Sequence, residues 1–356
     1  MSVSVLARQT SPLCYLPNDR LVCYQWGVIC VLIDGKEEKR FSIPISFKER
    51  FMGWNRYATR LLRFGIRSAI AIDNEHIVIS IGNMLHEVDL VKCALTKGWY
   101  CGEGIRPLIF SEVKGVDGFD DGIYFGGYLS NMEKKPVNIY QRKGIDEWQI
   151  VYTFPNGAIN HVHNIIADPF RNCLWMFTGD FDEASAIWKV FDNFKKVECV
   201  ASNDQKYRGC VAFATLEGLI YATDTPFSDN HVFLLKDDGS VEILADISGS
   251  CIYGCQWKDQ YVFSSTVEPD GRDESLKKLI FNKERGAGIV DNQVRLYSGN
   301  VAKGFKELYQ EKKDGMPYLF QFGVFKFPHG VAFGDMLFCQ PVATNKNDQY
   351  LLGLTQ

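Results

Sequence analysis

Short apolar runs closed by turn residues recur along most of the chain. Between residues 159 and 208, four such runs are separated by Asp168-Pro169, by Gly179-Asp180 and by an Asp-Asn pair. Runs of this length, bounded by Asp, Asn, Gly and Pro, are typical of strands rather than helices. The stretch therefore predicts a four-stranded antiparallel meander.

Comparable runs lie on both sides of this stretch. Before it, strands are expected at 21–25, 28–32, 41–45, 68–72, 76–81, 84–89, 122–126, 137–142 and 149–154. After it, they are expected at 209–214, 219–223, 232–236, 241–245, 253–257, 261–265, 293–297, 305–309, 323–327, 332–339 and 350–354. The runs form units of roughly 40 to 50 residues with three or four strands each, which is the repeat length of a propeller blade.

We therefore predict an all-β fold, a single β-propeller domain over residues 1–356 with four-stranded antiparallel blades. The pattern favours seven blades, with six as the alternative because the first and last units are incomplete. Both ends of a closed propeller usually contribute to one blade, which explains those incomplete units. Segment 46–64 is expected to be a helical insertion or a long loop, and 270–290 a charged insertion. A pair of β-sandwiches would need a linker near residue 178, and the repeats continue through that position.

Composition narrows the class of protein. A formal charge of -4 and a pI near 5.9 give no electrostatic basis for binding nucleic acid. No apolar run reaches the roughly 18 residues of a membrane span, and the N-terminal residues lack the apolar core of a signal peptide. The eleven cysteines fall mostly within expected strands. Buried free thiols suit a reducing compartment, so we expect a cytoplasmic protein.

Residues 136–180 resemble sialidase-superfamily propellers, whose Asp-box (BNR) hairpins have the form S-x-D-x-G-x-T-W. Residues 142–148, RKGIDEW, keep the Gly and the Trp but lack the Ser and the first Asp, and FDNFKKVECV at 191–200 is a remnant without the Trp. The repeat resemblance extends from about residue 60 to 327. It implies a propeller with carboxylate-binding arginines, a Tyr–Glu pair and an Asp acid. Arg63 and Arg208 are candidates for the arginines, but no motif places a third arginine or the Tyr–Glu pair.

Two histidines and the following Tyr-Arg pair are the first candidates for chemistry. His161 and His163 lie two residues apart on one strand and so face the same side, and Tyr207 and Arg208 precede the next blade. Some propellers of similar architecture are polysaccharide lyases that use His, Tyr and Arg. β-Elimination from a uronic acid would employ Arg208 on the carboxylate, a histidine as base and Tyr207 as acid. The competing interpretation is that the histidines are hydrogen-bonded core residues and Tyr207 a packed aromatic.

Three carboxylates follow apolar strands: Asp180, Asp224 and Glu268. Glycoside hydrolysis needs two carboxyl groups, one of them kept protonated by its surroundings. Capping of turn amides is the commoner role for such aspartates, whereas Glu is a poor turn former. We therefore expect Glu268 to be a catalytic candidate and the two aspartates to be substrate-binding candidates.

Basic and aromatic residues could complete a substrate site. Arg60, Arg63 and Arg67 would share one face if their segment were helical, and they would then form a basic rim for an anionic glycan or a solvated surface. Tyr253 could stack on a sugar ring, although most aromatic side chains of a propeller fill the space between blades.

The sequence thus predicts a carbohydrate-active propeller that acts on an acidic oligo- or polysaccharide by lyase-like elimination or glycoside hydrolysis. The alternative is a non-catalytic propeller that binds a glycan or another protein. No cofactor is implied; a divalent metal between His161 and His163 is left open but not favoured. The sequence does not determine the sugar, the linkage or the oligomeric state.

Overall fold

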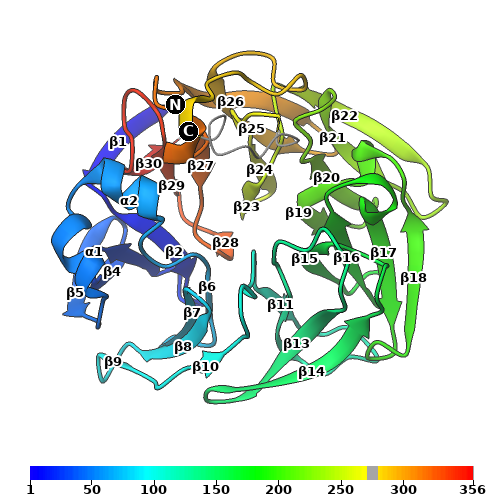
Figure 1. The fold of residues 1–356 in the computed structure, drawn as a ribbon, viewed down its shortest axis with the longest axis horizontal. Helices are drawn as coiled ribbons and strands as arrows, with labels where there is room; N and C mark the ends of the chain where they lie inside the picture. The colour runs from blue at the N-terminus through cyan, green and yellow to red at the C-terminus, as the bar shows by residue number, and fades with distance from the viewer. Residues whose placement is uncertain (271–279, 356) are drawn as a thin grey trace.

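The computed structural model describes residues 1–270 and 280–355. Seven sheets stand around a central channel like the blades of a propeller (Figure 1). The predicted all-β propeller is confirmed, and the blade count is seven, so the six-bladed alternative is wrong. Consecutive strands within each blade pair antiparallel, because the chain turns back between them; the one parallel pair among the described strands is β23 (Tyr253–Trp257) with the short β28 (Val331–Ala332) in blade 6.

Blades 1 to 3 come from the first part of the chain. Blade 1 contains β2 (Ser11–Tyr15), β3 (Leu21–Gln25), β4 (Val28–Ile33) and β5 (Lys36–Ser42). Blade 2 contains β6 (Ala69–Ala71), β7 (His76–Ile81), β8 (Met84–Asp89), β9 (Ala94–Leu95) and β10 (Trp99–Tyr100). Blade 3 contains β11 (Ser111–Val113), β12 (Gly122–Gly126), β13 (Val137–Gly144) and β14 (Glu147–Phe154).

Blades 4 to 6 follow with the most regular spacing. Blade 4 contains β15 (His161–Asp168), β16 (Cys173–Gly179), β17 (Ala186–Phe191) and β18 (Lys196–Ala201). Blade 5 contains β19 (Gly209–Ala214), β20 (Leu219–Thr223), β21 (Asn230–Leu235) and β22 (Val241–Ile247). Blade 6 contains β23 (Tyr253–Trp257), β24 (Gln260–Ser264), β25 (Gln293–Asn300) and β26 (Gly304–Lys312), and the short β28 (Val331–Ala332) pairs parallel with β23.

Blade 7 closes the ring with strands from both ends of the chain. Its inner three strands are β27 (Val324–Lys326), β29 (Met336–Val342) and β30 (Leu351–Thr355). Its outermost strand is β1 (Ser2–Ala7), which pairs antiparallel with β30 and places the two termini in one blade (Figure 1). Closure in this way pairs an edge that would otherwise be exposed.

The apolar core lies between the blades. Trp148, from the hairpin that resembles an Asp-box, packs edge-on against Phe125 and stacks on Phe110, in the cluster that joins blades 2 and 3. All eleven cysteines are free, and most are buried in these seams. Among the described residues, no helix is long and apolar enough to cross a membrane.

Segment 46–64 is helical, as one of the two sequence interpretations proposed. It forms α1 (Phe47–Met52), capped by the Ser46 hydroxyl, and α2 (Arg56–Leu62), capped by the Asn55 side chain. Short 3₁₀ turns η1 (Asp182–Ala184), η2 (Gln205–Tyr207) and η3 (Tyr318–Phe320) lie in other connections. The predicted charged insertion at 270–290 includes residues 271–279, which lie outside the described residues.

The expected row of arginines on one helical face is wrong. Helix α2 ends at Leu62, Arg63 adopts a left-handed conformation with φ of 53°, and Arg67 lies beyond the helix. Arg60 is completely buried, and its Nη1 lies 3.0 Å from Asp348 Oδ2 and 2.5 Å from Asp314 Oδ2. Arg60 therefore ties the helical insertion to blade 7 and is no part of a basic rim.

Candidate functional site

The candidate site lies at one end of blades 4 to 6, where the innermost strand of a blade begins and its second strand ends. His161 starts β15, and Arg208 directly precedes β19, the equivalent strand of blade 5. Asp180 and Asp224 each directly follow the second strand of their blades, and Glu268 follows β24 after three further residues. These three carboxylates are 44 residues apart in sequence, so equivalent points of three consecutive blades deliver acidic side chains to one mouth of the channel.

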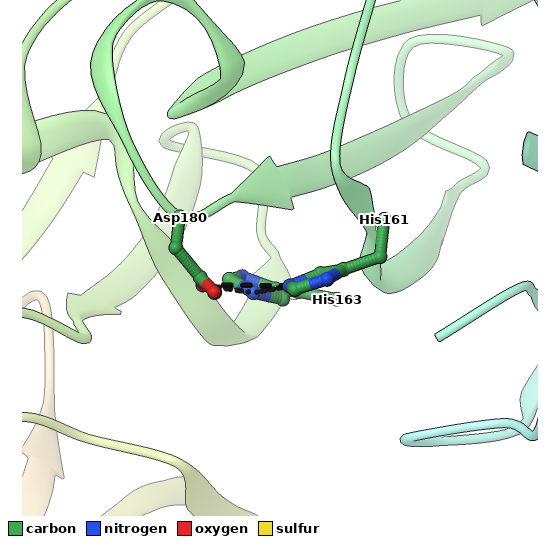
Figure 2. Close-up of side chains that lie close together, drawn as sticks. All are labelled: His161, His163 and Asp180. Carbon is green, nitrogen blue, oxygen red and sulfur yellow. Dashed lines mark hydrogen bonds and ion pairs between the residues drawn. The ribbon is translucent and has the colours of Figure 1, made fainter. Parts of the chain in front are cut away.

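His161, His163 and Asp180 form a compact group that we call the histidine–aspartate cluster (Figure 2). The Nε2 atoms of the two histidines are 3.0 Å apart, and Asp180 Oδ1 lies 3.1 Å from His163 Nε2 and 3.4 Å from His161 Nε2. His163 is the extra residue of a β-bulge in β15, a feature that redirects a side chain. Gly179 makes room for it, since a Cβ there would lie 2.3 Å from His163 Cε1.

Backbone carbonyl groups determine which ring nitrogen of His161 and of His163 carries a proton. His161 Nδ1 lies 2.9 Å from the Leu129 oxygen, and His163 Nδ1 lies 3.1 Å from the Gly209 oxygen. A carbonyl oxygen only accepts hydrogen bonds, so each Nδ1 carries the proton and donates it. In the neutral rings both Nε2 atoms are consequently unprotonated and turned toward Asp180.

Arg208 connects the cluster to the carboxylate of the next blade. Its Nη2 lies 3.2 Å from Asp180 Oδ1 and 3.6 Å from Asp224 Oδ2. Burial raises the pKa of Asp180, but the positive charge of Arg208 lowers it, and the net direction is well below its usual value. Cys210 donates its thiol proton to Asp224 Oδ2 at 3.3 Å. Asp224 Oδ1 and Arg208 Nε are buried without a hydrogen-bond partner among the described residues, which leaves one acceptor and one donor unused.

Glu268 differs from the two aspartates in its protonation. Burial, followed by the charge of Asp224, raises the pKa of Glu268 to about 8. The Ser250 hydroxyl donates a short hydrogen bond to it. The site thus combines a carboxyl group that stays protonated near neutrality with Asp180, whose pKa lies well below its usual value, a division that acid–base chemistry uses.

A pocket lies beside the histidines and carboxylates of the site. We call it the cationic pocket, because its lining includes Arg63, Arg67, Arg106 and Lys326. Its volume is about 210 Å³, and no carboxylate lines it. Burial and the nearby Arg63 and Arg67 lower the pKa of Lys326 to about 8, and burial with Arg106 and Arg63 lowers the pKa of Arg67. Among the described residues, none of the four is in an ion pair. Four cations that repel one another around a cavity indicate a site for an anion.

Tyr128 lies between the cationic pocket and the histidine–aspartate cluster. The Arg106 guanidinium sits over its ring at 5.4 Å, and the His161 ring lies 4.4 Å from it on the cluster side. Burial, Asp180, Cys210 and Asp224 raise the pKa of Tyr128, so its hydroxyl remains protonated. Tyr253 lines the same pocket, with Lys326 at 6.0 Å from its ring.

Most of the residues nominated from sequence meet at this mouth. His161, His163, Arg208, Asp180, Asp224 and Glu268 form its acid and imidazole side, and Arg63 and Tyr253 lie in the cationic pocket. Tyr207 does not join them. It is partly buried and packs against the core cluster between blades 4 and 5, with Lys206 over its ring.

Sequence reasoning missed Tyr128, Arg106 and Lys326. Tyr128 follows the second strand of blade 3, as Asp180 does in blade 4, so alignment of the repeats would have found it. Arg106 lies in a long connection, and Lys326 ends a short strand among aromatic residues. Neither has a local pattern that distinguishes it from a surface cation.

No protein-family model matches the chain, and no curated protein matches it in sequence. Solved structures are similar to it in shape. A chain of the mitotic checkpoint complex has a TM-score of 0.57 at 8% identity, with 100% of this chain and 93% of that chain covered. The β-propeller domain of Cps50 (Swd1) from Myceliophteria thermophila has a TM-score of 0.55 at 8% identity, with 100% and 99% covered.

The dihydro-heme d1 dehydrogenase NirN is a third, with a TM-score of 0.51 at 13% identity over 99% of this chain and 66% of that chain. The three proteins have unlike functions, and none is a sialidase. At these identities they define this chain as a β-propeller and carry no activity over to it.

Proposed function

We propose that this propeller binds and processes an acidic glycan at the mouth that holds the cationic pocket. The supporting observation is the pocket itself: Arg63, Arg67, Arg106 and Lys326 surround about 210 Å³ without a lining carboxylate. A uronate or sialate carboxylate would supply the missing negative charge, and Arg presents a fork that matches it. Tyr253 and Tyr128 also line the pocket and would contact the sugar.

Elimination is the reaction that these neighbours suit first. Cations neutralise the carboxylate, which acidifies the adjacent C–H, and a base then removes that proton. The Nε2 atoms of His161 and His163 are unprotonated in the neutral rings, and the protonated Tyr128 hydroxyl is the candidate acid for the leaving oxygen. Tyr128 takes the role that the sequence assigned to Tyr207, because Tyr207 packs against the core cluster of blades 4 and 5 and does not line the pocket.

Hydrolysis is the second candidate, favoured by one observation. Glu268, with its pKa raised to about 8, could donate a proton while the ionised Asp180 or Asp224 serves as base or nucleophile. Sialidase-like chemistry belongs to this class, and the residual Asp-box hairpin at 142–148 supports only a relationship of fold.

The test is incubation of the purified chain with a panel of acidic polysaccharides. Ultraviolet absorbance of an unsaturated uronate together with new reducing ends would establish elimination. New reducing ends without that absorbance would establish hydrolysis. Binding in the absence of both signals would leave the glycan-binding propeller, and absence of binding across the panel would overturn the proposal.

A further inference from the structure

We propose that His161, His163 and Asp180 bind one divalent first-row transition-metal ion, with zinc as the reference ion. The proposal does not rest on the proposed glycan activity. It rests on the directions of three acceptor atoms at the channel mouth (Figure 2).

The first step concerns charge. Both histidine Nδ1 atoms donate to backbone carbonyls, so in the neutral rings His161 Nε2 and His163 Nε2 present lone pairs, as does Asp180 Oδ1. These atoms lie 3.0, 3.1 and 3.4 Å apart. Three acceptors at such separations repel one another unless a proton or a metal cation lies among them. Backbone carbonyls behind the imidazoles are also the partners that usually orient metal-binding histidines.

The second step concerns size. Separations of 3.0, 3.1 and 3.4 Å place the three atoms on a circle of radius about 1.8 Å, so an ion about 2.0–2.1 Å from each would sit slightly to one side of their plane. That is the bond length of zinc to nitrogen and oxygen. Two imidazoles and one carboxylate form a donor set for zinc, iron or copper, whereas calcium and magnesium prefer oxygen alone.

The third step concerns neighbouring groups. Asp180 and Asp224 carry two negative charges near the single positive charge of Arg208, so the surroundings favour an added cation. A second group, His163 with Cys210 and Asp224, is also compact. It is the weaker candidate because His163 has one free nitrogen, which faces Asp180, and because the Cys210 thiol proton is donated to Asp224.

An ion in this position changes the chemistry available to the mouth. Its three protein ligands leave coordination positions open for water or a substrate oxygen, as in catalytic rather than structural sites. With the ion bound, the two imidazoles act as ligands and no longer accept a proton. Activity that disappears with a chelator and returns with the metal would then distinguish a metal-assisted reaction from one in which a histidine is the base.

The test uses the full chain without a polyhistidine tag, stripped of metal with a chelator and titrated with zinc alone by calorimetry. We expect one equivalent to bind and to raise the melting temperature. Asp180→Asn and His161→Ala should each weaken zinc binding by at least about tenfold, since loss of a group that only orients a ligand already costs about that much. The matched control is His231→Ala, which removes a histidine paired with Asp246 at 2.8 Å outside the cluster and should bind zinc like the parent chain.

Cobalt substitution gives a second measurement that does not depend on a variant folding. Visible d–d absorption of the stoichiometric cobalt complex, displaced by zinc, would support a nitrogen–oxygen site. The proposal is overturned if the parent chain binds neither zinc nor cobalt stoichiometrically, or if the cluster variants bind zinc as tightly as the parent. Neither result bears on glycan binding, because no glycan is present in these measurements.

Discussion

The ring of Tyr128 lies 4.4 Å from the ring of His161, so a side chain of blade 3 contacts the first residue of the inner strand of blade 4. Tyr128 also lines the cationic pocket. Its side chain therefore contacts both the pocket and the histidine–aspartate cluster. Burial and nearby carboxylates keep its hydroxyl protonated, and the proposed elimination uses this hydroxyl as the acid.

The first prediction is that Tyr128→Phe abolishes product formation but preserves binding. The substitution keeps the ring contacts and removes only the hydroxyl, and loss of a general acid typically costs about 10²–10⁴ in rate. Turnover of the best substrate and its affinity, measured separately, check this. The control is Tyr207→Phe, which should retain turnover because Tyr207 packs between blades 4 and 5. Loss of turnover in Tyr207→Phe alone would reverse the assignment.

The second prediction is that Arg106→Gln and Arg67→Gln weaken an anionic ligand while leaving the fold as stable as before or more so. The removed charge attracts the ligand but repels the other cations of the pocket. We expect affinity to fall about tenfold, in line with one charge-assisted hydrogen bond. Ligand titration and thermal unfolding measure the two effects.

Lys303→Gln is the charge-matched control for that pair of variants, because Lys303 forms an exposed ion pair with Asp259 at 3.0 Å. The affinity of Lys303→Gln for the anionic ligand should equal that of the parent chain. A fall in melting temperature in the pocket variants, in parallel with their affinity, would instead make these arginines structural.

The third prediction concerns pH. Burial and Asp224 raise the pKa of Glu268 from 4.5 to about 8, so the folded chain holds this proton more tightly than the unfolded chain. The resulting stabilisation is fully present below pH 4.5 and is lost as the pH rises through about 8. Asp180 and Asp224, which disfavour the ionised form, and Arg208, which favours it, are the charged groups acting on Glu268.

Glu268→Gln removes that proton equilibrium but keeps the shape. Its melting temperature should rise relative to that of the parent as the pH increases from about 5 to about 9. Glu242→Gln, at an exposed pair with Lys236, should show no such divergence. A constant difference between Glu268→Gln and the parent across the whole range would contradict the raised pKa.

The fourth prediction separates Arg60 from Arg63. Arg60→Met leaves Asp314 and Asp348 without their buried partner and should destabilise the fold by about 3–5 kcal/mol. Arg63→Met, three residues further on, should leave stability unchanged but weaken the anionic ligand. Chemical denaturation and ligand titration of both variants check the contrast. An equal loss of stability in Arg60→Met and Arg63→Met would contradict the claim that the buried ion pairs of Arg60 stabilise the fold.

The pattern of short apolar runs predicted most of the strands and the propeller architecture. The predicted strands at 76–81, 84–89 and 209–214 coincide with β7, β8 and β19, because each is a buried run bounded by clear turn residues. Strand β1 was missed although Val3 and Val5 alternate with Ser2 and Ser4, because none of its residues is buried and it is held by pairing with β30. Pairing over such a distance has no local signal.

The site was predictable where the repeat positions it. Asp180, Asp224 and Glu268 could be nominated because each follows a strand, and the closed ring brings equivalent points together. Arg60 was misplaced because a helical face does not say which side is buried. Tyr207 and Arg208 are neighbours in sequence, yet one enters the blade seam and the other the mouth, a choice made by the 3₁₀ turn η2 that ends between them.

Closure of the ring by β1 and β30 has a consequence for the order of synthesis. The chain is made from its N-terminus, so β1 must wait until the last strand of blade 7 has emerged before it finds its partner. A nascent chain that ends after β26 already contains His161, Asp180 and Arg208, but Lys326 and the other pocket residues from 321 to 326 are still missing. The cationic pocket therefore gains the positive charge of Lys326 only after β27 has been made.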